Sequence, residues 1–267
     1  MILKGLSPCL IGERINPTSK KQLTEEIRQG ECRWIQQEAR RQEEAGVDAI
    51  DVNVGVPGIE EGEAMRRAVR AIRAVSKLPL FLDSPRAETL AAGLREAQDR
   101  VILNSVTGAC PEATEQVFRM AREHGADVVA LTLDKRGVST TWRDRVAVGR
   151  SILGWARSQG LPEENLIMDP LTTPVRKFPG GVQETLFTIR ALKEELGVMT
   201  CIGLSNISYG LEERSRVNAQ FLGLALISGI DMVILDPLDD EVMSAAKSGR
   251  SGNLTEGAIR RFVEAIQ

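Results

Sequence analysis

Acidic and amide side chains stand at the ends of short apolar runs throughout this sequence. Each run stops abruptly at a polar residue, most often Asp, Asn or Glu. The residues concerned are Glu13, Asn16, Asp51, Asn53, Asp83, Asn104, Asp134, Asp169, Asn206 and Asp236. Because few cations accompany them, two kinds of chemistry are open. One is ligation of a divalent cation by oxygen atoms, and the other is recognition of a ligand rich in N–H donors.

The second kind of chemistry suits a flat heterocycle. A carboxylate accepts two parallel N–H bonds from an edge that carries a ring N–H beside an amino group, as in pterin or guanine. Amide side chains add donors and acceptors that distinguish ring nitrogens from carbonyls. The polar set therefore predicts either a cation site or a pocket for such a ring.

A purely structural interpretation competes with both. Asp, Asn and Ser at a strand end often cap the next helix or close a turn. Capping of the next helix remains an open explanation for Ser84 and Ser205. A turn is the better explanation for Asp236, which precedes Pro237. The number of acids and amides favours a site, because capping explains each residue singly but does not require so many together.

The apolar runs themselves predict the architecture that positions these residues. Runs typical of strands alternate eight times with segments of helical pattern, which is the signature of an α/β fold of the (β/α)8 TIM barrel type. In that fold the strand ends converge on one mouth, where the active site lies. The predicted strands are 9–16, 49–54, 79–84, 100–105, 127–134, 165–170, 200–206 and 231–236.

Helical patterns fill the intervals between the predicted strands. They cover roughly 31–46, 60–76, 86–97, 112–124, 142–159, 182–196, 212–229 and 239–247, with a last helix at 254–267 that Thr255 could cap. The longest loops, 16–31 and 170–181, follow the first and sixth strands at the predicted mouth. No linker or low-complexity tract interrupts the pattern, so we expect residues 1–267 to form a single domain.

Composition narrows the function further. A formal net charge of −3 gives no basic surface for nucleic acid. The opening MILKGLSPCLIGER lacks a signal-peptide pattern, and no run is long enough to cross a membrane. We therefore expect a cytoplasmic protein that binds neither nucleic acid nor membrane.

The cysteines and the histidine argue against several kinds of site. The four cysteines lie far apart without a CxxC pair, and His124 is the only histidine. This fits a reducing compartment and predicts no metal site built from His and Cys. It also removes the usual Ser–His–Asp and Cys–His catalytic arrangements.

Six motifs carry a resemblance to a known family. GERIN (12–16), DVNVG (51–55), LDSP (82–85), ILNS (102–105), MDPL (168–171) and GLSNIS (203–208) occur in order at the predicted strand ends. Together they resemble the pterin-binding methyltransferases, which include methyltetrahydrofolate:corrinoid/iron–sulfur protein methyltransferase and the folate module of cobalamin-dependent methionine synthase. The resemblance implies methyl transfer between N5 of tetrahydrofolate and the cobalt of a corrinoid (cobalamin) carried on a separate corrinoid protein, and it implies a homodimer.

The resemblance also assigns roles to individual residues. Asp83, Asn104 and Asp169 match the residues that hydrogen-bond the pterin ring. Asn206 matches the mobile, catalytic Asn that approaches N5, the nitrogen bearing the methyl group of methyltetrahydrofolate. The remaining matches are substrate-binding positions, namely Gly203, Ser205, Arg214, Glu13, Asn16, Asp51 and Asn53.

Related pterin proteins fit less well. Dihydropteroate synthase (DHPS) shares the pterin pocket but has a Lys/Arg motif on the seventh strand and an Arg–x–His ending, whereas this chain reads GLSNIS there and ILDPLDDE after the eighth strand. A complete methionine synthase carries a cobalamin module with a DxHxxG motif, which the surroundings of His124 lack. The corrinoid is therefore expected on another protein.

Two other functional classes remain open. A Schiff-base barrel enzyme needs a lysine near a strand end, and Lys135 is the candidate, although an exposed loop lysine is the more common case. A folate-binding barrel without catalytic activity is the second, because a fold and a pocket do not establish turnover. Borohydride trapping would reveal the first class, and pterin binding without methyl transfer would favour the second.

Overall fold

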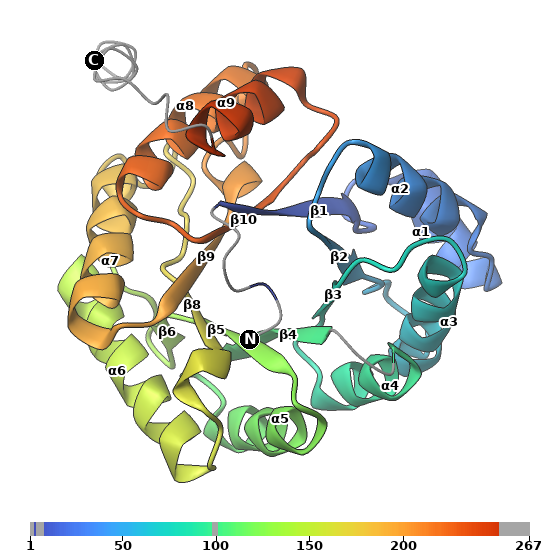
Figure 1. The fold of residues 1–267 in the computed structure, drawn as a ribbon, viewed down its shortest axis with the longest axis horizontal. Helices are drawn as coiled ribbons and strands as arrows, with labels where there is room; N and C mark the ends of the chain where they lie inside the picture. The colour runs from blue at the N-terminus through green and yellow to red at the C-terminus, as the bar shows by residue number, and fades with distance from the viewer. Residues whose placement is uncertain (1–2, 4–7, 98–100, 251–267) are drawn as a thin grey trace.

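Eight parallel strands close into a barrel, as the sequence predicts. The computed structural model describes residues 3, 8–97 and 101–250. In this part of the chain the barrel strands follow one another around the ring in the order β1, β10, β9, β8, β5, β4, β3 and β2 (Figure 1). Their bounds are β1 Cys9–Ile15, β2 Ala49–Asn53, β3 Leu80–Asp83, β4 Val101–Thr107, β5 Asp127–Leu131, β8 Leu166–Asp169, β9 Met199–Gly203 and β10 Met232–Leu235.

Helices surround this ring on its outside, as Figure 1 shows. Those of the described residues are α1 Lys21–Gln29, α2 Arg33–Glu44, α3 Glu61–Arg73, α4 Ala87–Ala97, α5 Pro111–His124, α6 Trp142–Ser158, α7 Gly181–Leu196, α8 Arg214–Ile227 and α9 Asp240–Arg250. The predicted helix at 254–267 lies outside the described residues. Within the described residues, no helix is both long and apolar enough to span a membrane.

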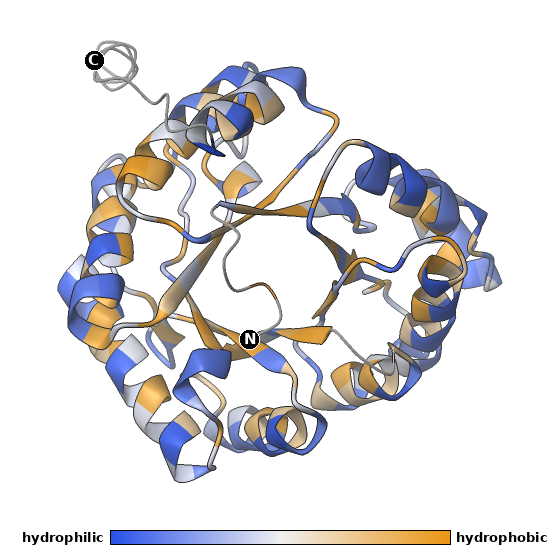
Figure 2. Ribbon diagram, in the orientation of Figure 1, coloured by the Kyte–Doolittle hydropathy of each residue, from blue (hydrophilic) through white to orange (hydrophobic). Residues whose placement is uncertain are grey.

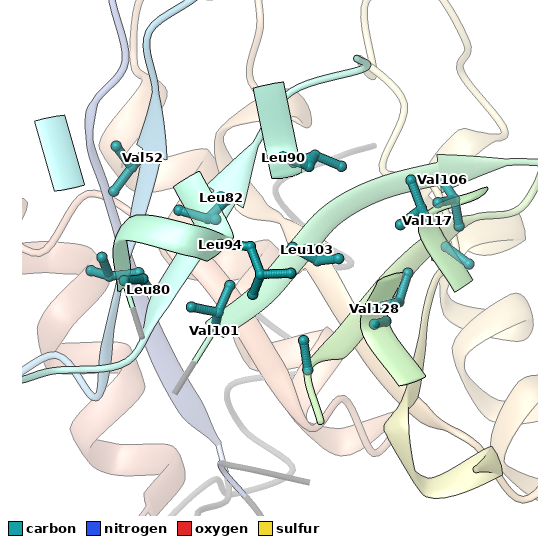
Figure 3. Close-up of a cluster of buried hydrophobic side chains, with 14 of the residues drawn as sticks. Val52, Leu80, Leu82, Leu90, Leu94, Val101, Leu103, Val106, Val117 and Val128 are labelled. Carbon is teal, nitrogen blue, oxygen red and sulfur yellow. The ribbon is translucent and has the colours of Figure 1, made fainter. Parts of the chain in front are cut away.

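The strand residues divide between two cores because successive side chains of a strand point to opposite faces. Leu80 and Leu82 of β3 face outward and pack with Leu90 and Leu94 of α4 (Figure 3). Phe81, between them, faces inward and belongs to a separate interior cluster with Ile102, Ile167 and Cys201, among others. Figure 2 shows the helices correspondingly apolar toward the strands and polar toward solvent.

The structure corrects three of the predicted boundaries. The predicted loop 16–31 contains α1, which is held by its buried residues Leu23 and Ile27. The fifth barrel strand ends at Leu131 instead of Asp134, because the chain leaves the barrel to form a two-stranded hairpin, β6 Leu133–Asp134 and β7 Gly137–Val138. The predicted seventh strand ends at Gly203, and Asn206 closes a short 3-10 helix, η2 Leu204–Asn206.

Candidate functional site

The polar residues at the strand ends face the barrel interior. Each continues the inward-facing positions of its strand, since it follows an apolar residue of the interior cluster by two positions. Parallel pairing also places Asn53 beside Asp83 and Asp83 beside Asn104 across β2, β3 and β4. The residues that share this inward position are Glu13 after Ile11, Asp51 after Ala49, Asp83 after Phe81, Asn104 after Ile102, and Asp169 after Ile167.

Two amide–carboxylate pairs form one wall of the mouth. Asn53 Nδ2 donates to Asp83 Oδ2 over 2.9 Å, and Asn104 Nδ2 donates to Asp51 Oδ1 over 3.1 Å. Asn53 Oδ1 in turn accepts from the backbone N–H of Gly55 at 2.9 Å, which fixes the orientation of its amide. Each pair uses one carboxylate oxygen and leaves lone pairs for a ligand.

These carboxylates are held in an environment that opposes their ionisation. Burial raises the pKa of Asp51 well above its usual range, and the charge of Asp83 raises it further, although the hydrogen bond from Asn104 works against both. Burial likewise raises the pKa of Asp83, against the hydrogen bond from Asn53 and together with the charge of Glu61. A ligand that brings N–H donors would relieve this cost, because it would stabilise the charged form.

Asp169 forms another wall of the mouth, at the end of β8. Its Oδ1 accepts from the backbone N–H of Leu171 at 2.7 Å. Burial raises the pKa of Asp169 to about 7, although the hydrogen bond from Leu171 and the charge of Arg145 both lower it. Its carboxyl group therefore changes charge near neutral pH, where a ligand can select the ionised form.

The shifted pKa makes a prediction about stability. The pKa of Asp169 lies at about 7 in the folded chain against an ordinary 3.8, so the folded state keeps a proton that the unfolded chain loses. The contribution of Asp169 to the free energy of unfolding is therefore largest at pH values below 3.8 and decreases as the pH rises to about 7. We expect Asp169→Asn to raise the melting temperature more at pH 8 than at pH 5. Thermal unfolding at both values tests this, and an equal shift at both would contradict it.

The end of β1 and the segment that follows β9 form a third part of the site. Ser205 Oγ donates to Glu13 Oε1 over 2.5 Å, which joins the end of β1 to η2. Burial raises the pKa of Glu13, and the hydrogen bond from Ser205 opposes that shift. Arg214 donates from Nη2 to the carbonyl oxygen of Ser205 at 2.9 Å and from Nε to Ser208 Oγ at 3.0 Å. Arg214 thus holds the loop that carries Asn206.

Asn206 is exposed within this firmly held loop. Its amide lies over Gly203, since a Cβ atom on Gly203 would stand 3.0 Å from Asn206 Nδ2. Only a residue without a side chain leaves the Asn206 amide in this place undisturbed. The anchors on both sides of Asn206 fix its backbone, and its exposed side chain can reach a ligand in the mouth.

Some of the polar residues of the sequence serve turns. Asn16 Oδ1 accepts from the N–H of Thr18 at 2.9 Å, which closes a turn after β1. Asp236 Oδ1 accepts from the N–H of Leu238 at 3.0 Å, as the turn interpretation predicts, while its Oδ2 pairs with Arg14 Nη1 at 2.8 Å. Asp134 lies in the β6–β7 hairpin and binds Arg136, outside the barrel mouth.

The structure adds residues that the sequence pattern did not single out. Glu61, in the first turn of α3, accepts a hydrogen bond from Ser84 Oγ at 2.5 Å. Ser84 Oγ also accepts from the backbone N–H of Arg86 at 3.1 Å, which closes a turn after β3. Arg145 of α6 is buried and reaches the loop that follows Asp169. Nothing in their sequence surroundings distinguishes either residue from the many charged residues on solvated helix faces.

The clustered acids do not form an evident metal site. Across the described residues, no three or more His, Cys, Asp or Glu side chains are arranged to hold a metal ion. The amide partners occupy one oxygen of Asp51 and one of Asp83. The geometry therefore favours the second chemistry of the sequence analysis, acceptance of N–H groups from a flat ligand.

Comparison with known proteins supports that chemistry. A family model described as pterin binding enzyme matches residues 12–236. Methionine synthases of Mycobacterium leprae and Mycobacterium tuberculosis are each 31% identical over 242 residues, which is 86% of this chain. The chain spans 20% of the length of those proteins. Methylcorrinoid:tetrahydrofolate methyltransferase of Eubacterium limosum is 28% identical over 247 residues, and the match covers 88% of both chains.

A solved structure shows the same fold. Yersinia pestis DHPS, determined with a pterine–sulfa conjugate, superposes with a TM-score of 0.66 at 15% identity, over 92% of this chain and 93% of its own. The motifs at the strand ends, the position of the acids and amides inside the mouth, and the match of the family model over most of the barrel agree. The chain therefore belongs to the family of pterin binding enzymes.

Proposed function

We propose that this protein transfers a methyl group between N5 of tetrahydrofolate and the cobalt of a corrinoid carried on a separate protein. The observation that carries the proposal is a mouth lined by hydrogen-bonded carboxylates and amides, with an exposed amide, that of Asn206, held beside it. The names of the relatives support the same reaction, since one is a methylcorrinoid:tetrahydrofolate methyltransferase and matches along 88% of its length.

In this proposal the walls of the mouth bind the pterin ring. The carboxylates of Asp83 and Asp169 accept from the ring edge, and the amide of Asn104 can both donate to it and accept from it. A carboxylate facing a ring N–H and an adjacent amino group forms a bidentate, charge-assisted pair. Asp51 and Asn53 act on the ring indirectly. The hydrogen bond of Asp51 orients the Asn104 amide, and that of Asn53 orients the Asp83 carboxylate.

Asn206 assists the chemical step. The methyl group on a neutral tertiary amine is a poor electrophile, because the departing nitrogen is strongly basic. A hydrogen bond that Asn206 donates to N5 and that strengthens as the C–N bond breaks lowers this barrier, and N5 takes the proton that replaces the methyl group from solvent. The help from Asn206 is electrostatic and involves no covalent intermediate. The same interaction assists the reverse reaction, in which a methylcorrinoid donates to tetrahydrofolate, so both directions should be assayed.

In this scheme the corrinoid is carried by a partner protein. His124, the one histidine of the chain, is exposed near the end of α5, and its Nδ1 lies 2.9 Å from the carbonyl oxygen of Met120 in the preceding turn. It is on the outside of the barrel and lacks the surrounding motif of a cobalamin module. We propose that the corrinoid protein docks over the mouth, where N5 would be accessible.

A spectral assay tests the proposed function directly. The protein is mixed with methyltetrahydrofolate and free cob(I)alamin, and the Co(I) absorption band is followed. We expect the band to decay faster with the protein than without it. A protein that binds a reduced pterin but leaves the band unchanged, with free cobalamin and with corrinoid proteins, would instead be a folate-binding barrel without this activity.

The proposal predicts that a chelator does not inhibit the reaction. The cobalt is held by the corrinoid macrocycle, and the described residues offer no cluster of ligands for a further ion. Methyl transfer should therefore proceed at the same rate after prolonged treatment with a chelator and buffer exchange. Activity that is lost to the chelator and restored by zinc would contradict this prediction, and measured metal content would locate the ion.

A further inference from the structure

A cavity outside the barrel mouth is lined in part by the loop that follows β8. Its volume is about 260 Å³. Its walls are the end of the β6–β7 hairpin, the loop 170–180 and the first residues of α7. None of the residues predicted from sequence as site residues lines it. The side chains that decide its chemistry are Arg145, Thr173, Lys177 and Glu184.

Arg145 brings a buried positive charge to this cavity. The residue is 2% exposed. Its Nε donates to the carbonyl oxygen of Ser139 at 2.9 Å, and its Nη1 donates to those of Pro170 and Leu171 at 3.0 and 2.9 Å. These partners are neutral, and the negative charges that act on the guanidinium are those of Glu184 and Asp169. Lys177 adds a second positive charge to the lining and Glu184 adds one negative charge, so the cavity favours an anion.

Thr173 supplies an unused hydrogen-bonding group. It is 6% exposed, and its Oγ1 has no hydrogen-bond partner among the described residues. The hydroxyl lies against the start of α7, since a Cβ atom on Gly181 would stand 2.2 Å from it. The cap residue of α7, Gly180, provides no side-chain acceptor. The N–H of Gly181 donates to the carbonyl oxygen of Phe178 at 2.8 Å, and the N–H groups that follow it in the first turn also favour an anion.

Glu184 limits the charge that the cavity can accept. It lines the same cavity, and its Oε2 accepts from the N–H of Trp142 at 2.5 Å. Arg145 and Lys177 therefore face one fixed negative charge. A singly charged carboxylate would balance this arrangement, whereas a phosphate dianion would be repelled by Glu184 more strongly.

The loop that lines the cavity also borders the proposed pterin site. Loop 170–180 begins directly after Asp169 and runs along the loop of Asn206, because the N–H of Val175 donates to the carbonyl oxygen of Ile207 at 3.1 Å. Arg176 Nη1 donates to the carbonyl oxygen of Gly210 at 2.8 Å. The tail of tetrahydrofolate is attached to the ring carbon next to N5, so it leaves the ring on the side of Asn206.

We propose that this cavity is a carboxylate site that takes a glutamate carboxylate of the folate tail. This inference rests on the proposed function for the identity of the ligand. Arg145, the hydroxyl of Thr173 and the N–H groups at the start of α7 bind the carboxylate, and Lys177 adds an exposed charge at the rim. The tail contributes affinity there without touching the reacting nitrogen.

Three ligands distinguish binding at this site from binding at the pterin site. They are methyltetrahydrofolate, a reduced pterin without a tail, and p-aminobenzoylglutamate, which has the tail but no pterin. Thr173→Val removes the hydroxyl with little change of shape, and Lys177→Gln changes an exposed residue. Lys77→Gln, an exposed lysine that precedes β3 at the opposite end of the barrel, is the matched control. Dissociation constants are measured by calorimetry, and thermal unfolding verifies that each variant folds.

We expect Thr173→Val to weaken methyltetrahydrofolate and p-aminobenzoylglutamate about tenfold and the tail-less pterin not at all. Lys177→Gln should weaken the same two ligands less, by up to about fivefold, because its charge is screened. Equal losses for all three ligands, or no loss for any, would overturn the carboxylate site. If the wild-type protein binds p-aminobenzoylglutamate through Thr173 but no reduced pterin, the proposed function fails while the carboxylate site stands.

Discussion

Replacing Asn206 by Ala is expected to slow methyl transfer at saturating folate by about 10²–10³-fold while changing the dissociation constant of the folate little. The reason is that a hydrogen bond to N5 becomes stronger as the methyl group departs and the nitrogen gains charge. An interaction that is stronger in the transition state than in the ground state lowers the rate when it is removed, without an equal loss of binding. The exposed position of Asn206 allows water to replace part of the bond, so the smaller value is the more reasonable expectation.

Single-turnover rates measured beside dissociation constants decide this prediction. Asp83→Ala is the contrasting variant, because its carboxylate contacts the ring before reaction and its loss should weaken binding first. Gly203→Ala offers an independent check, since the added Cβ would stand 3.0 Å from Asn206 Nδ2, a contact tight enough to shift the amide by a few tenths of an ångström. An Asn206→Ala protein that transfers methyl groups at the wild-type rate would reduce Asn206 to a binding or structural residue.

The barrel was predictable from the sequence because its strands are bounded by clear physical signals. Apolar runs of four to seven residues end at polar residues, and the glycines that precede several strands have the positive φ that tight turns require, as at Gly46 and Gly197, with φ of 90° and 68°. The helices between the runs carry an apolar face of the right period. Local pattern and tertiary position agree in these elements, so the order and type of the elements follow from the residues alone.

The wrong boundaries arise where local pattern and tertiary position disagree. The apolar pattern of the run that ends at Asp134 continues past the end of β5 at Leu131. The chain leaves the barrel there because β6 pairs with β7, and Gly137 at the turn between them has a φ of 92°. α1 begins without a side-chain cap at Lys20, so no signal marks its start. Its existence depends on the burial of Leu23 and Ile27 against the barrel, which is a tertiary contact.

The candidate site was only partly predictable for the same reason. The types of Asp51, Asn53, Asp83 and Asn104 suggest a polar mouth, but which amide binds which acid depends on strand register. Arg145 could not be found, because an arginine in a helix is usually solvated and only the fold buries this one. The roles of these residues toward a pterin ring remain predictions that binding measurements must test.

Binding of a reduced pterin should depend most on Asp83, Asn104 and Asp169. Loss of a hydrogen-bonding partner inside the mouth should cost about 1–3 kcal/mol of binding free energy, and the larger value applies where a charged group is involved. This corresponds to dissociation constants about 5- to 150-fold weaker. Asp134→Asn is a matched control, because Asp134 lies in the β6–β7 hairpin and binds Arg136. Unchanged affinity in Asp169→Ala and Asn104→Ala would reject the assignment of the pterin site.

The pH dependence of binding identifies the part that Asp169 plays. Its pKa of about 7 in the free protein means that a ligand donating N–H groups must first displace a proton below neutral pH. Affinity should therefore rise with pH, by up to about tenfold per unit below pH 7, and level off above it. Asp169→Asn cannot ionise, so this contribution should disappear while any that comes from Asp51 and Asp83 remains. If the variant keeps the full pH dependence of the wild type, Asp169 does not bind the ring as a carboxylate.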